Sequence, residues 1–235
     1  MEALIRPPIT FAHRGARAHA PENTLPAFEL ALRLGASGLE SDVWLSADGV
    51  PVLDHDGVVR QGLRRRRISQ FRFDELPEWV PSLGQLYATC GTNFELSLDV
   101  KDPAAAGAVI AEAKAAGPEA EAKLWLCHPS WETVAGWRDL SDRVRLVDST
   151  RIGRIKEGPE RRAATLAEVG INAINMHAND WTGGLTTLFH RFELVCLGWD
   201  AQHERVLMEL LVMGVDGVFS DHVDRMMEVL GRFNR

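Results

Sequence analysis

Short apolar runs alternate with amphipathic segments along the whole chain. The runs predict β-strands and the segments between them predict helices, so strand and helix repeat in turn. This repeat favours a parallel sheet, because each pair of parallel strands needs a helical crossover. We expect strands over residues 9–12, 38–44, 51–54, 94–100, 123–127, 144–147, 171–174, 193–197 and 215–219, and helices over 24–34, 82–90, 104–116, 131–140, 160–169, 181–190, 202–213 and 223–232.

The number of repeats indicates a closed barrel. About eight strand–helix units fit into 235 residues, close to the usual size of a (β/α)8 or TIM barrel. The competing architecture is an open doubly wound sheet, which would carry a glycine-rich phosphate turn after its first strand, and HRGARAHAPENT lacks the G-x-G-x-x-G pattern. We therefore expect one α/β domain over residues 1–235, a TIM barrel with a short excursion after the second strand, over residues 56–82.

Composition limits the classes of binding partner and the cellular compartments that we expect for the protein. The formal charge of −7 argues against a nucleic-acid or anionic-membrane surface, since both need a basic field. The sequence has no apolar run long enough to span a membrane, and residues 1–15 lack the apolar stretch of a signal peptide. Three widely spaced cysteines suit free thiols in a reducing compartment. We expect a cytoplasmic protein with no stable membrane insertion, whose oligomeric state stays open.

The first helix has well-marked boundaries. Asn23 or Thr24 can cap its start, and Gly35 can end it. The apolar residues Leu25, Phe28 and Leu32 recur at helical spacing.

Acidic residues end two neighbouring strands of the predicted barrel. Glu40 and Asp42 are two residues apart on one strand, so both side chains point to the same face, and Asp99 lies near the end of the next long strand. The active site of a barrel lies at the carboxyl ends of its strands. Three carboxylates that converge there without a cysteine predict a site for one divalent cation, Mg²⁺ or Ca²⁺, with Mn²⁺ as a further option.

Two histidines and two cations accompany these carboxylates. His13 and His55 each follow a short strand, and imidazole can transfer protons near neutral pH. Arg14 and Lys101 provide positive charge for a phosphate. Because a phosphodiester needs a cation, phosphate-binding groups and two proton-transfer groups, these residues indicate phosphodiester chemistry.

One long stretch resembles the opening of the glycerophosphodiester phosphodiesterase family. It is HRGARAHAPENTLPAFELALRLGASGLESDVWLSADGVPVLDHD, with the HRG, PENT, E-x-D, DG and HD elements in order. Weaker similarity continues through VPSLGQL, ELSLDVK and LGWDAQHERVLMELLVMGVDGVFSDHVDRM, and is thin between residues 120 and 190. The resemblance implies a TIM-barrel hydrolase that cleaves a glycerophosphodiester to glycerol 3-phosphate, or a related phosphomonoester, and an alcohol.

The resemblance also implies roles for individual residues. His13 and His55 would form the acid–base pair, Arg14 and Lys101 would bind the phosphate, and Trp199 would line the glycerol pocket. The metal ligands would be Glu40, Asp42 and Asp99.

The chain departs from the family pattern in several places. Asp99 stands where the family usually has Glu, WD replaces W-T-V-N, and SDHVD replaces T-D-x-P. His128 falls near a position where the family often has Ser, and would add a third histidine at the mouth.

Two further readings of the function stay open at this point. One is a lyase-type phospholipase that makes a cyclic phosphate, and the other is a barrel that binds a phosphoester without turning it over. In either case we expect a small phosphodiester as the partner.

Other basic residues lie outside the predicted catalytic set. Arg64 to Arg67 form either a solvated loop or a docking patch for an anionic group. For His19 and His177 we favour hydrogen bonds that brace loops.

Overall fold

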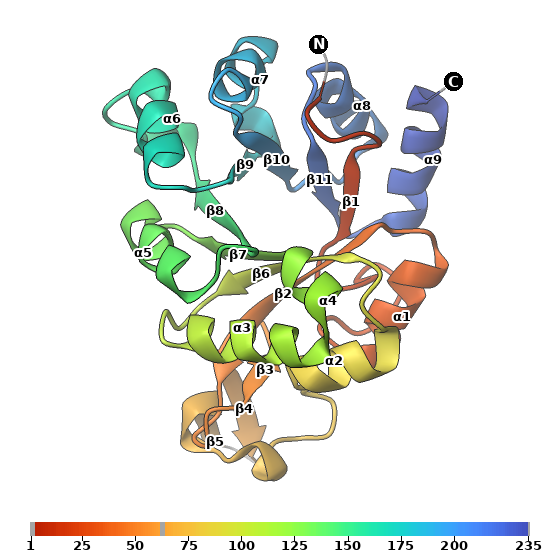
Figure 1. The fold of residues 1–235 in the computed structure, drawn as a ribbon. Helices are drawn as coiled ribbons and strands as arrows, with labels where there is room; N and C mark the ends of the chain where they lie inside the picture. The colour runs from red at the N-terminus through yellow and green to blue at the C-terminus, as the bar shows by residue number, and fades with distance from the viewer. Residues whose placement is uncertain (1–2, 62–63, 235) are drawn as a thin grey trace.

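Eight parallel strands close on themselves in the part of the chain that the structure describes, residues 3–61 and 64–234. The structure is a computed structural model, and Figure 1 shows the strands at its centre with the helices around them. Residues 1–2 of the N-terminal segment and residues 62–63 of GLRRRRIS lie outside the described part. In order around the ring the strands are β1 (Ile9–Ala12), β2 (Gly38–Leu45), β6 (Glu95–Val100), β7 (Leu124–His128), β8 (Arg145–Thr150), β9 (Ala173–His177), β10 (Val195–Trp199) and β11 (Gly217–Ser220).

The ring closes because β1 pairs in parallel with both β2 and β11. The predicted TIM barrel is therefore confirmed. A short strand, β3 (Pro51–Leu53), extends the sheet by pairing antiparallel with the end of β2.

Helices follow the strands and cover the outside of the barrel (Figure 1). None of the helices in the described ranges is long and apolar enough to cross a membrane. The helices are α1 (Leu25–Arg33), α2 (Leu83–Cys90), α3 (Ala105–Ala116), α4 (Pro118–Ala122), α5 (Trp131–Gly136), α6 (Pro159–Glu168), α7 (Gly183–His190), α8 (Glu204–Val212) and α9 (Val223–Phe233).

Side chains alternate along each strand between an outer core, which lies under the helices, and the barrel interior. On β6, Leu96 and Leu98 are buried in the layer between strands and helices, while Asp99 lines a cavity at the mouth of the barrel. Inside the barrel, the ring of Phe11 stacks on that of Phe219 with centroids 4.5 Å apart. Since Phe219 also lines this cavity, the aromatic interior forms part of its floor.

Helix α1 begins where the sequence predicts. The side-chain oxygen of Thr24 accepts a hydrogen bond from the backbone N–H of Ala27, so Thr24 is the cap. Asn23 has a different task, because its side-chain oxygen accepts a hydrogen bond of 2.7 Å from Ser41 on β2. Gly35 follows the helix with a φ of 99°, as expected of a residue that ends one.

The excursion over residues 56–82 contains a β-hairpin that the sequence does not predict. Its strands, β4 (Val58–Gln61) and β5 (Arg64–Arg67), pair antiparallel and lie at the foot of Figure 1. Strands were predicted from short apolar runs. Because β5 consists of four arginines, which are unusual in a strand, this pattern did not indicate it. Short 3₁₀ turns over Ile68–Gln70 and Phe73–Glu75 return the chain to α2.

Candidate active site

A cavity of about 530 Å³ opens at the carboxyl ends of the barrel strands. It brings together all eight predicted site residues, which come from five different parts of the chain. These residues are His13, Arg14, Glu40, Asp42, His55, Asp99, Lys101 and Trp199. Sequence analysis did not select the other residues that line it, which are Ser97, Ser149, Thr150, Arg151, Arg154, Asn175, Asp200, Gln202 and Phe219.

Glu40, Asp42 and Asp99 form a cluster of carboxylates in this cavity. One oxygen of each lies within 4.8 Å of the others. The strand register explains the cluster, since Asp42 on β2 pairs directly with Asp99 on β6, and Glu40 is one inward-facing position earlier. Glu40 and Asp42 are buried, with 7% and 2% of their surfaces exposed.

Burial and mutual repulsion raise the pKa of two carboxyl groups in this cluster, so both are harder to ionise. Burial raises the pKa of Glu40 to about 8, and the neighbouring Asp42 and Asp99 add to the shift while His13 opposes it. Burial also raises the pKa of Asp99, against the effect of Lys101. Three acids in these surroundings need positive charge to stay ionised together.

Lys101 supplies part of that charge. Its Nζ lies 2.8 Å from Asp42 Oδ1 and 3.2 Å from Asp99 Oδ2. Burial lowers the pKa of Lys101, but the two carboxylates outweigh burial and raise it. Lys101 is therefore a fixed cation beside the cluster.

Arg14 is held in a turn by the same acids. Its backbone N–H donates a hydrogen bond of 2.9 Å to Glu40 Oε2, and its Nε lies 3.4 Å from Asp42 Oδ2. The side chain also donates to Glu22, which belongs to the PENT motif. The following residue must be glycine, because a Cβ on Gly15 would lie 2.8 Å from a backbone carbon of Ala27 at a φ of 78°.

His13 is oriented by a carboxylate that sequence analysis missed. Its Nδ1 lies 2.6 Å from Asp221 Oδ1, and its Nε2 lies 3.8 Å from Glu40 Oε2. Burial disfavours the charged imidazole, but Glu40 and the Asp221 hydrogen bond outweigh it, so the pKa of His13 is raised. The sequence offered two signals for Asp221, its position directly after the last strand and its place in SDHVD, the segment that stands where the family has T-D-x-P.

His55 lies in a tight turn after β3. Its Nδ1 is 2.9 Å from the exposed carboxylate of Asp56. Asp54 accepts a hydrogen bond of 2.7 Å from the backbone of Gly57, which closes the turn. His55 thus lines the cavity with a carboxylate behind it, as His13 does, but its side chain is more exposed.

Trp199 ends β10 and lines the other side of the cavity. The ring of His177 stands edge-on to it, with centroids 4.6 Å apart. His177 Nε2 in turn lies 3.2 Å from Asp200 Oδ2, so His177 has the bracing hydrogen bond that the sequence suggested. The guanidinium carbon of Arg151 lies 5.6 Å from the centre of the Trp199 ring.

The remaining basic candidates lie away from the cavity lining. His19 pairs with Asp224 at 3.1 Å, in keeping with a bracing role. The Nδ1 of His128 accepts a hydrogen bond from the backbone of Ser130, and His128 is not among the described residues that line the cavity. The same is true of the β5 arginines Arg65–Arg67, so a direct contact between them and a substrate in this cavity has no support.

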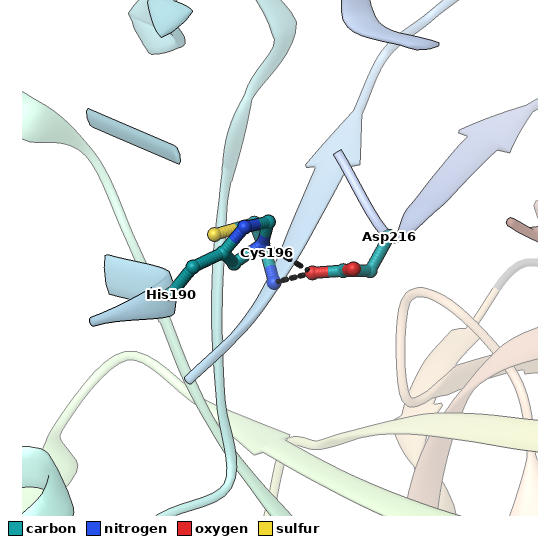
Figure 2. A group of neighbouring side chains, drawn as sticks. All are labelled: His190, Cys196 and Asp216. Atoms are coloured by element: carbon teal, nitrogen blue, oxygen red, sulfur yellow. Dashed lines mark hydrogen bonds and ion pairs between the residues drawn. The ribbon is translucent and has the colours of Figure 1, made fainter. Parts of the chain in front are cut away.

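A second group of metal-ligating residue types lies at the opposite end of the barrel. Figure 2 shows His190, Cys196 and Asp216, whose side chains offer atoms within 4.8 Å of one another. Asp216 Oδ2 accepts hydrogen bonds from His190 Nε2 and from the Cys196 backbone, and Oδ1 accepts from the backbones of Leu4 and Ile5. With four hydrogen bonds already made, this carboxylate anchors the start of the chain.

Burial also keeps the thiol of this group neutral. It raises the pKa of Cys196 well above 9, and the nearby Asp216 adds to the shift. A protonated thiol and a saturated carboxylate do not suit a metal ion.

The carboxylate cluster in the cavity, by contrast, fits a hard divalent cation. Its donors are all oxygens, from Glu40, Asp42 and Asp99. Asp42 Oδ2 is buried and accepts no hydrogen bond from the described residues, so it has a lone pair to offer. A cation would also supply the positive charge that three neighbouring acids, two of them buried, require.

Comparisons with known proteins agree with this geometry. Residues 13–101 match the Glycerophosphoryl diester phosphodiesterase family, a range that contains every site residue proposed above except Trp199 and Asp221. A Glycerophosphodiester phosphodiesterase of Bacillus altitudinis is 26% identical over 247 aligned positions, which cover 93% of this chain and 96% of the relative. The chain is also 57% identical to the mouse Glycerophosphodiester phosphodiesterase domain-containing protein 4 over 49 residues, 21% of this chain and 8% of the mouse protein.

A solved structure shares the fold. The phosphodiesterase of Oleispira antarctica, in complex with the product sn-glycerol-3-phosphate, superposes with a TM-score of 0.79 at 20% identity, over 95% of this chain and 97% of that one. The enzyme class predicted from the sequence, a phosphoric diester hydrolase, is the class to which these relatives belong. With the barrel and the residues of its cavity, these matches show that the chain is similar to the glycerophosphoryl diester phosphodiesterase family, whose model matches residues 13–101.

Proposed function

We propose that the protein hydrolyses glycerophosphodiesters to glycerol 3-phosphate, or a related phosphomonoester, and an alcohol, with the help of one divalent cation. The observation that carries this proposal is the meeting of three carboxylates, two histidines and two basic side chains in a single cavity. The product bound to the Oleispira antarctica relative supports the choice of substrate class.

Glu40, Asp42 and Asp99 would hold the cation, with Mg²⁺, Ca²⁺ and Mn²⁺ as the candidates. When bound, such an ion neutralises charge on the phosphoryl oxygens and lowers the pKa of a hydroxyl group near it. Asp99 has a shorter side chain than the Glu that the family usually has at this position. It nevertheless lies in register with Asp42, so the strand pairing places its carboxylate beside the other two.

Arg14 and Lys101 would bind the phosphate. Both lie beside Asp42, so they border the region where the cation would be held. Arg14 is kept in place from two sides, by Glu40 and by Glu22. Such positioning lets a guanidinium meet the phosphate without first reorganising.

His13 and His55 would transfer the protons. Asp221 holds His13 Nδ1, which leaves Nε2 as the atom to exchange a proton in the cavity. Asp56 holds His55 Nδ1 in the same way, so His55 would also act through Nε2. An in-line displacement needs one group to take the proton of the attacking hydroxyl and another to protonate the departing alkoxide.

Hydrolysis of glycerophosphocholine, followed by phosphorus NMR with and without EDTA, tests this function. We expect glycerol 3-phosphate to appear, its formation to stop with EDTA, and activity to return with added Mg²⁺, Ca²⁺ or Mn²⁺. Activity that is indifferent to chelation would remove the cation from the proposal. A persistent cyclic phosphate would instead indicate the lyase, and binding without turnover would indicate a silent barrel.

A matched pair of variants connects the cation to the cluster. Asp99→Asn should lower kcat at least about a hundredfold, because it removes a charged ligand. Asp142→Asn replaces an exposed aspartate that does not line the cavity and should keep wild-type activity. Equal activity in the two variants would contradict the assignment of the cluster.

A further inference from the structure

The cavity has a second basic side, away from the carboxylate cluster. Strand β8 lies opposite β1 in the ring, four strands away in either direction. The chain that leaves β8 places Arg151 and Arg154 in the cavity lining. The proposed hydrolysis uses neither residue.

Arg151 is fixed in place by an ion pair. Its Nε and one terminal nitrogen lie 2.6 and 3.3 Å from the two carboxylate oxygens of Asp180, and Asp180 also accepts from the backbone of Ile152. This fork uses one edge of the guanidinium and leaves a terminal nitrogen free to donate elsewhere. Since Arg151 also lies beside the Trp199 ring, it borders the space next to the proposed glycerol pocket.

Arg154 differs from the other cations of the cavity. Arg14 and Lys101 lie against the acidic cluster and Arg151 against Asp180, whereas the exposed side chain of Arg154 makes no hydrogen bond or ion pair with the described residues. Asp200, an acidic residue that also lines the cavity, already accepts a hydrogen bond from Gln202 and contacts His177. Arg154 therefore offers a whole guanidinium to a ligand.

A buried amide on the next strand also lacks a partner. Asn175 on β9 is 5% exposed, lines the cavity and pairs in register with Ser149 on β8. Its Oδ1 is buried and makes no hydrogen bond with the described residues. This oxygen accepts hydrogen bonds and does not donate them, so a hydroxyl or ammonium group of a ligand would satisfy it, and an anion would not.

We propose that Arg154, with Arg151 three residues before it, forms a second anion subsite that binds a carboxylate or a second phosphate on the alcohol part of the substrate, while Asn175 Oδ1 accepts a hydrogen bond from a hydroxyl or ammonium group of the same part. This inference rests on the proposed phosphodiester hydrolysis and narrows its substrate class. A volume of about 530 Å³ leaves room for a substituted alcohol beyond the glycerophosphate. Guanidinium groups bind both anions through paired hydrogen bonds.

Two substrates that differ by one carboxylate test the subsite. Glycerophosphoserine and glycerophosphoethanolamine share the ammonium group, and the carboxylate is present in the serine compound alone. We expect the wild-type protein to favour glycerophosphoserine in kcat/KM by about two- to fivefold, through KM, as one exposed ion pair allows. Arg154→Gln should remove this preference through KM for glycerophosphoserine, and Arg154→Lys should keep part of it.

The second pair of substrates separates the two kinds of anion. Glycerophosphoinositol 4-phosphate and glycerophosphoinositol differ by one phosphate, so a preference in this pair alone identifies the anion as phosphate. Arg65→Gln is the control, because Arg65 is an exposed arginine on β5 that does not line the cavity. It should leave every preference unchanged.

The outcomes distinguish this inference from the function on which it rests. If the wild-type protein hydrolyses none of the four compounds, the proposed function fails. If it hydrolyses them without preferring either anionic member, or if Arg154→Gln slows both members of a pair equally, the function stands and the subsite is wrong.

Discussion

His13 Nδ1 and Asp221 Oδ1 lie 2.6 Å apart, although 208 positions separate the two residues in the sequence. The contact orients the imidazole so that Nε2 is directed to the cavity. It also contributes to the raised pKa of His13. Asp221 is thus a positioning residue for the proposed chemistry, and it acts through His13.

Asp221→Asn should lower kcat by about ten- to a hundredfold with little change in KM, since the carboxylate orients a group without touching the substrate. Because Asp221 helps to raise the pKa of His13, the variant should also move the limb of the pH–rate profile that reports His13 to lower pH. Asp224→Asn is the matched control, because Asp224 pairs with His19 away from the cavity. A pH profile that does not move would assign Asp221 a structural role only.

Replacing either proposed proton-transfer group should be more severe. His13→Ala and His55→Ala should each lower kcat by about 10² to 10⁴, the usual contribution of general acid–base catalysis. His19→Ala removes a histidine that is close to His13 in the sequence but lies outside the cavity lining, so it should retain near wild-type kcat. Steady-state kinetics on glycerophosphocholine measures all three, and near wild-type rates for His13→Ala or His55→Ala would end the assignment.

Cation binding should depend on pH through Glu40. Burial raises the pKa of this group from 4.5 to about 8, so a cation must displace its proton below pH 8. The affinity for Mn²⁺ should therefore weaken as pH falls from 8 to 6, by up to about tenfold per pH unit for one proton displaced.

The same shift fixes how the stability of the metal-free protein changes with pH. A pKa that is higher in the folded state than in the unfolded one contributes stability below about pH 4.5, and this contribution is lost as pH rises through about 8. The rise in Tm on adding Mn²⁺ to metal-stripped protein should thus be larger at pH 8 than at pH 6. A rise that is equal at both values, or one that keeps its pH dependence in Glu40→Gln, would contradict this reasoning.

Gly15→Ala should destabilise the fold at the turn that carries Arg14. The new Cβ would lie 2.8 Å from a backbone carbon of Ala27, in addition to the cost of a positive φ. Gly49→Ala isolates the second effect, because Gly49 has a φ of 80° but no atom within 4 Å of an added Cβ. We expect a loss of about 1–2 kcal/mol for Gly49→Ala and about 1–3 kcal/mol more for Gly15→Ala, from denaturant unfolding, and equal losses would be inconsistent with a clash.

The barrel and the carboxylate cluster were predictable because both follow local rules. Apolar runs mark the strands, and the two-residue period of a strand places Glu40 and Asp42 on one face. The register of β2 against β6 then brings Asp99 beside them. The catalytic and binding roles of these residues, the single domain and the cytoplasmic location stay predictions.

What the sequence did not indicate depends on distant parts of the chain or on unusual composition. Asp221 comes close to His13 only because β11 pairs with β1. Arg154 and Asn175 belong to no motif and became apparent only as lining residues of the cavity. Strand β5 is formed by arginines, which lack the apolar period that marks the other strands.

β1 pairs with both β2 and β11, so the barrel can close only after the ribosome has synthesised β11. The ribosome completes the two histidines, the acidic cluster and both proposed phosphate-binding residues by residue 101, but β11 is made only at residues 217–220. Until then β1 has one unpaired edge, which is prone to pair with another chain, and His13 lacks Asp221. A growing chain is therefore vulnerable to aggregation and unable to reach its working geometry until the last strand has been made.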